Sequence, residues 1–146
     1  MTIFAHPVAA TVLLLIAAHG GGLSVQHSWF RYLDAEVPAG GYLTLRNDSA
    51  TPAELTAASS PACGKLMLHE SVSHNGVDTM HPVASITVPA HGTFAFSPGR
   101  YHLMCMHPKM RIGENVPVTL RFKVGKTLTA TFPVFGPAGP PRASSR

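Results

Sequence analysis

Thioether and imidazole side chains are concentrated in less than a third of this chain. Five of the six methionines and six of the nine histidines lie between Met67 and Met110. Thioethers are soft, uncharged ligands that favour Cu(I) over Mg²⁺, Ca²⁺ or Mn²⁺, whereas zinc prefers thiolate, imidazole and carboxylate. A site that combines methionine with histidine therefore indicates a monovalent copper ion, provided that the fold brings the side chains together.

A β-hairpin is expected to bring the first two candidate ligands onto one face. Asn75-Gly76 is a strong signal for a two-residue type I′ turn, because both central residues of that turn need positive φ. The turn predicts that residue 74 pairs with 77, residue 71 with Met80, and His69 with Pro82. His69 and Met80 are then diagonal neighbours, about 7–8 Å apart, a gap that two long side chains can close.

His102 and Met104 form the second candidate pair. Alternate residues of a strand share a face, so these two point together while Leu103 and Cys105 point to the other side, where Leu103 suits the core. Two strand pairs, each with one imidazole and one thioether, can close around a single ion. Four neutral ligands leave Cu⁺ with its single charge, which suits holding and passing on the ion. Because no nucleophile or acid–base pair accompanies them, we expect a protein that is not an enzyme.

The elements that position these residues are predicted to be strands. Short apolar or alternating runs, bounded by Gly, Pro, Asn or Ser, recur about every ten residues, and no stretch shows helical periodicity over twelve residues. The expected strands lie within residues 25–32, 42–46, 54–58, 66–74, 84–88, 93–96, 101–106, 118–122 and 128–134. This spacing predicts an all-β fold, either an antiparallel β-sandwich or a Greek-key barrel.

The composition limits the classes of protein that the chain can belong to. Its 146 residues suit one domain, and 13 glycines with 13 prolines disfavour long helices. A charged fraction of 12% is too low for a coiled coil. The net charge of +4 comes from 11 basic and 7 acidic residues that are scattered singly, so we expect no nucleic-acid partner.

The two ends of the chain differ from its centre. Residues 8–18 are apolar and would rise about 16 Å as a helix, roughly half of a bilayer core, which is typical of a signal peptide. We therefore predict a signal peptide at 1–22, a β-sandwich domain at 23–135, and a disordered tail rich in Pro, Gly and Ser at 136–146. The signal predicts a protein of the periplasm or one that is secreted.

The spacing of the four candidate ligands resembles the signature of the periplasmic copper chaperone family PCu(A)C. His69, Met80, His102 and Met104 follow the pattern H-x10-M-x21-H-x-M. The flanking segments are similar as well: GYLTLRN at 41–47, LHE at 68–70, MHPV at 80–83, PG at 98–99 and VPVTL at 116–120. The similarity covers nearly all of the predicted domain.

This resemblance implies a cupredoxin-like β-sandwich that binds Cu(I) through His69, Met80, His102 and Met104. It further implies a copper carrier for assembly of the CuA centre of cytochrome c oxidase. The expected partners are copper and a copper-accepting protein, such as cytochrome c oxidase subunit II or a Sco-type protein. We expect the carrier to be a monomer without a stable membrane span.

Cys63 and Cys105 depart from the family pattern and allow three interpretations. They form a disulfide, remain as separate buried thiols, or place one thiol near the copper. The segment Cys105-Met106-His107 also resembles a blue-copper loop, so an electron-transfer protein is an alternative. A metal-free β-sandwich that recognises another ligand is a second alternative.

Further soft side chains accompany the main four. Met67 should share the face of His69, and Met106 that of His102 and Met104, either as packing residues or as secondary ligands. His81, His91 and His107 are expected in loops or at strand ends, where they could also support a separate Cu(II) site. His74 is expected to be exposed at the hairpin turn.

Overall fold

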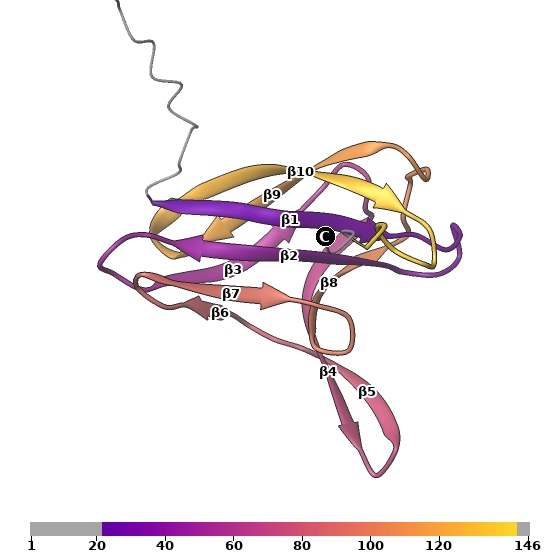
Figure 1. Ribbon diagram of the computed structural model, residues 1–146, viewed down its shortest axis with the longest axis horizontal. Coiled ribbons are helices and arrows are strands. Elements are labelled where there is room, and N and C mark those ends of the chain that lie inside the picture. The colour runs from indigo at the N-terminus through magenta and orange to yellow at the C-terminus, as the bar shows by residue number, and fades with distance from the viewer. Residues whose placement is uncertain (1–21, 143–146) are drawn as a thin grey trace, which may run out of the picture.

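The computed structural model describes residues 22–142, which are nearly all β (Figure 1). Within this range there is no α-helix, and one short 3-10 turn, Lys123–Gly125, separates the last two strands. The strands are β1 (Leu23–Arg31), β2 (Ala39–Asn47), β3 (Ala53–Ser59), β4 (Lys65–His74), β5 (Val77–Pro82), β6 (Ile86–Val88), β7 (Gly92–Phe96), β8 (Tyr101–Met106), β9 (Asn115–Phe122) and β10 (Thr127–Phe135). The all-β prediction is therefore confirmed.

The strands follow one continuous order, β5-β4-β8-β2-β1-β10-β9-β3-β6. One edge of β2 is shared: its first part, Ala39–Gly41, pairs with β8, and the rest pairs with β7. Among the described strands, β1 and β10 are parallel, with Phe30 opposite Val134, and the other pairs are antiparallel. This parallel contact departs from a purely antiparallel sandwich. It is possible because β1 and β10 are the first and last strands, so no tight turn fixes their relative direction.

Strands from both ends of this order contribute side chains to one core. In β9, Val116, Val118, Leu120 and Phe122 are buried while most of the residues between them are exposed, the alternation of a strand with one face on the core. The largest fully buried side chains of the core are Phe30, Leu43, Leu45, Leu55, Leu103, Leu120 and Phe132. Leu103 faces the core, as predicted.

The β4–β5 hairpin extends away from the body of the sandwich (Figure 1). All six residues of β5 are exposed, since β5 is an end strand of the sheet order. Asn75 and Gly76 have φ values of 51° and 77°, as a type I′ turn requires. The register agrees with the prediction: His74 pairs with Val77, residue 71 with 80, and residue 69 with 82.

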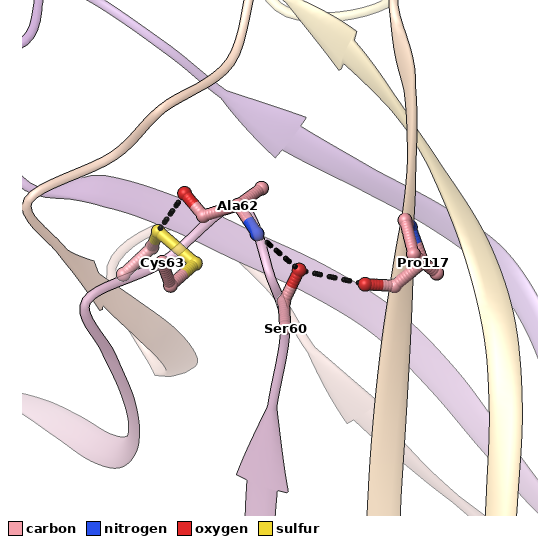
Figure 2. Close-up of a disulfide and its surroundings, with 5 residues drawn as sticks. Ser60, Ala62, Cys63 and Pro117 are labelled. Atoms are coloured by element: carbon pink, nitrogen blue, oxygen red, sulfur yellow. Dashed lines mark hydrogen bonds between the residues drawn. A yellow bond between two sulfur atoms is a disulfide. The ribbon is translucent and has the colours of Figure 1, made fainter.

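A disulfide joins Cys63 to Cys105, with a Cα–Cα distance of 5.3 Å, which decides between the three interpretations left open by the sequence. It ties the loop after β3 to β8 (Figure 2). The same loop is held on its other side by Ser60, whose hydroxyl donates a hydrogen bond to the Pro117 carbonyl at 2.6 Å and accepts one from the Ala62 N–H at 3.2 Å. The loop is therefore attached to both β8 and β9.

The predicted leader lies almost entirely outside the described residues, and so do the last four residues of the predicted tail. Residues 136–142 follow β10 with a turn in which the Gly139 N–H donates to the Gly136 carbonyl at 3.0 Å. Both end assignments stay predictions. In the described range, 22–142, no helix has the length and apolar character needed to cross a membrane.

Candidate metal centre

Two candidate ligands, His69 and His102, lie directly opposite each other on the adjacent strands β4 and β8. Their ring centroids are 5.8 Å apart. Only 9% of His69 and 6% of His102 is exposed, although both lie on the side of the sheet away from Leu103. The sequence predicted the two strand pairs separately, but only the fold places β4 beside β8 and brings the imidazoles together.

The local environment keeps both imidazoles suited to binding a cation. Burial lowers the pKa of His69 below the ordinary histidine value, and the neighbouring His102 lowers it further. His69 Nδ1 is buried without a hydrogen-bond partner, which costs free energy that a bound cation would recover. His102 Nδ1 lies 3.3 Å from the Arg100 carbonyl oxygen. Because that oxygen can only accept, this hydrogen bond uses a proton on Nδ1 and leaves Nε2 as the ring nitrogen that can bind a metal.

The two candidate thioethers flank the histidines. Met104 follows His102 by two residues on β8 and so shares its face, and Met80 on β5 lies opposite Ser71, two residues along β4 from His69. Met80, His102 and Met104 line one open cavity of about 190 Å³. His69 is not among the residues that line it, and it adjoins the cavity through its contact with His102. Met80 is 56% exposed, so this candidate ligand is accessible from solvent.

The far wall of the cavity comes from β1 and β2. Gly40 lies opposite Met104, and a Cβ atom at Gly40 would be 2.7 Å from the Tyr42 hydroxyl oxygen, so a larger residue there would displace that ring. Burial raises the pKa of the Tyr42 phenol, and the nearby Arg31 guanidinium opposes this shift. Sequence reasoning missed both Arg31 and Tyr42, since nothing in the local pattern places β1 and β2 beside the ligands.

Two of the remaining methionines lie on the face of the candidate ligands, whereas the other histidines of the described residues are dispersed. Met67 lies opposite Met104 and Met106 opposite Lys65, on the predicted face. His74 and His81 are exposed on the hairpin, with His81 Nε2 hydrogen-bonded to the Thr79 hydroxyl at 3.0 Å. His91 and His107 occupy turns with φ near 50°. In the part of the chain that the structure describes, no three His, Cys, Asp or Glu residues cluster closely enough to hold a metal, so the suggested Cu(II) site finds no support.

The donor set excludes the blue-copper alternative. Such a centre needs a cysteine thiolate, but both cysteines of the chain are joined in the disulfide. Cys105 is also fully buried on the core side of β8, away from His102. What this face offers is imidazole nitrogen and thioether sulfur, a neutral and soft set that fits Cu(I).

Comparison with known proteins places the chain in a family. A family model described as "Putative lipoprotein LpqE-like" matches residues 23–134. The chain belongs to the LpqE-like family. A relative named "Putative lipoprotein Lxx21020", from Leifsonia xyli subsp. xyli (strain CTCB07), is 33% identical over 116 residues, covering 77% of this chain and 69% of the relative.

Solved structures similar to this LpqE-like protein are PCuAC domains. The copper-bound PCuAC domain from PmoF2 matches with a TM-score of 0.68 and 22% identity, over 82% of this chain and 97% of that one. Apo-DR1885 from Deinococcus radiodurans matches with a TM-score of 0.61 and 26% identity, over 93% and 94% of the two chains. The Cu(I) form of DR1885 is 30% identical over 76% and 78%, with a TM-score of 0.58. The predicted resemblance to PCu(A)C and the predicted sandwich are thus confirmed.

Proposed function

We propose that this LpqE-like protein is a metallochaperone that binds one Cu(I) ion through His69, Met80, His102 and Met104 and passes it to an acceptor protein. The observation that carries the proposal is the direct pairing of His69 with His102, with Met104 and Met80 on the same face of the sheet. The similar PmoF2 domain is copper-bound and the similar DR1885 structure is its Cu(I) form, which supports the choice of cargo.

The exposure of the ligands supports transfer rather than permanent binding. The two imidazoles are almost fully buried, whereas Met80 is more than half exposed at the edge of the sheet. An incoming ligand from an acceptor can therefore replace the Met80 thioether first, while both histidines still hold the ion. This order keeps the ion bound during exchange and needs no catalytic group, so we assign a carrier and not an enzyme.

The setting of the protein follows from the same proposal. An intact disulfide is typical of an oxidising compartment, and the relatives are described as lipoproteins, which supports export to the periplasm or beyond the cell. The family resemblance makes the CuA centre of cytochrome c oxidase the proposed destination. Subunit II of that oxidase or a Sco-type protein is then the proposed acceptor, met by a monomeric carrier.

Anaerobic competition against a chromogenic Cu(I) chelator tests the ligand set. The parent should bind one Cu(I), and Met80→Ala or His102→Ala should weaken binding at least about tenfold, since even residues that only support metal ligands contribute that much. His74→Ala and Met110→Leu are matched controls that remove an imidazole and a thioether away from the site. Parent-like affinity in both ligand variants would show that the ligands are misassigned, and no Cu(I) binding by the parent would favour the metal-free module.

A further inference from the structure

Arg31 lies beside the proposed copper site without an acidic partner. It lines the same cavity as Met80, His102 and Met104. The ion pairs of the described residues join Arg46 to Asp48 and Lys123 to Glu54, and neither involves Arg31. Its Nε atom is buried and has no hydrogen-bond partner. The residue as a whole is half-buried and lines the cavity, so an anion there would meet the exposed part of a guanidinium that has no acidic partner.

The strands hold the guanidinium in a defined place. Its central carbon is 5.3 Å from the ring centroid of Trp29 and 5.7 Å from that of Tyr42, both contacts of the cation–π type. Arg31 pairs with Gly40, and Gly40 pairs with Met104, so the three residues form one row across β1, β2 and β8. Two strand spacings separate Arg31 from Met104 at the backbone, about 10 Å. Gly40 adds no side chain between them, and the Tyr42 hydroxyl oxygen stands over it, 2.7 Å from the position that a Gly40 Cβ would take.

We propose that Arg31 forms a subsite for a single carboxylate group, and that this carboxylate and Cu(I) bind cooperatively. The inference rests on the proposed copper site. Four neutral ligands leave the bound ion with one positive charge, which faces the charge of Arg31 across the cavity. No acidic residue lines the cavity. A carboxylate between the two cations attracts both, so each ligand strengthens the binding of the other by the same factor.

The charge of the cavity lining favours a carboxylate over a phosphate. The open cavity of about 190 Å³ has room for one carboxylate group. Arg31 is the one Lys or Arg among the residues that line the cavity, and its single charge balances one carboxylate but not a doubly charged phosphate. The planar guanidinium matches two carboxylate oxygens. The carboxylate comes either from a small free acid or from an acidic side chain of the protein that receives the copper.

The fluorescence of Trp29, the only tryptophan of the chain, provides the assay because its ring contacts Arg31. Sodium acetate is titrated into the apo and the Cu(I)-loaded protein in chloride-free buffer at constant ionic strength, with acetamide as the neutral control. Acetate should bind the loaded form at least about fivefold more tightly. Equal acetate affinities in the two forms, or a similar response to acetamide, would overturn the proposal.

Three variants separate this inference from the copper site itself. Arg31→Gln keeps the four proposed ligands, so it should bind Cu(I) with an affinity that no longer depends on acetate. Arg31→Lys keeps the charge but loses the planar fork, and should retain only part of the acetate dependence. Unchanged acetate dependence in Arg31→Gln would show that acetate binds the copper directly. Met104→Ala tests the reverse case. If this variant loses Cu(I) binding while its apo form still binds acetate, the Arg31 subsite exists independently of the copper site.

The source of the carboxylate is tested with N-acetyl-aspartyl-methioninamide, which joins a carboxylate to a thioether copper ligand. If the aspartyl compound binds the Cu(I)-loaded parent more tightly than acetate and more tightly than its asparaginyl analogue, the carboxylate comes from an acidic side chain of an incoming acceptor. If the aspartyl compound binds no more tightly than acetate, the carboxylate comes from a small free acid. If the aspartyl and asparaginyl compounds bind the parent equally and acetate does not bind, no carboxylate subsite exists.

Discussion

Reduction of the Cys63–Cys105 disulfide should lower the free energy of unfolding by about 4 kcal/mol. The sequence separation of 42 closes a ring of 43 residues (42 + 1), and the chain-entropy model gives about 4 kcal/mol for that size. Cys105 is fully buried and Cys63 is partly buried against the same core, so we expect both thiols to stay in place on reduction and the effect to act through the unfolded chain. For a domain of this size the loss corresponds to a fall in Tm of about 12–20 °C.

The assay is urea unfolding of the protein with and without a phosphine reductant, followed by Trp29 fluorescence. The slope of unfolding free energy against urea should rise on reduction, because an unfolded chain without the cross-link exposes more surface. The matched control is Cys63→Ala/Cys105→Ala, which should not respond to reductant. A loss below about 1 kcal/mol in the parent, or an equal response in the control, would refute the entropic argument.

Three further predictions concern stability. Met80→Ala should change the unfolding free energy of the apo protein by less than about 0.5 kcal/mol, because Met80 is exposed. In the same urea titration, Leu103→Ala should lower it by about 3–5 kcal/mol, because Leu103 is fully buried in the core. Gly41→Ala should cost about 1–3 kcal/mol by thermal melting, since the new Cβ would lie 2.8 Å from Phe30 Cε1; an unchanged Tm would show that the core can relax. Because the pKa of His69 is lowered by folding, the unfolded chain binds more protons, so apo stability is retained above about pH 6.5 and falls as the pH drops below it. The unfolding free energy of the parent should fall more between pH 7.5 and pH 5 than that of His69→Gln. An equal fall in the parent and in the variant would contradict this role of His69.

The sequence predicted the strands well where the signals are local. Alternation of apolar and polar residues depends on the two-residue period of a strand, so it located the observed strands and the core-facing Leu103. The Asn75-Gly76 turn fixed the register of the β4–β5 hairpin, because a two-residue loop at 75–76 makes residue 74 pair with residue 77. The strand β5 was expected from this pairing alone, since its exposed residues show no apolar alternation.

By itself, then, the sequence determined which residues form strands, which side chains share a face within each strand, and the spacing that resembles PCu(A)C domains. Only the tertiary structure decided that β4 lies beside β8, so that His69 faces His102, and that Cys63 reaches Cys105. It also placed Arg31 across Gly40 from Met104. Contacts between segments distant in the chain depend on how the whole core packs and on the entropy of closing long loops, and no local pattern of residues encodes either.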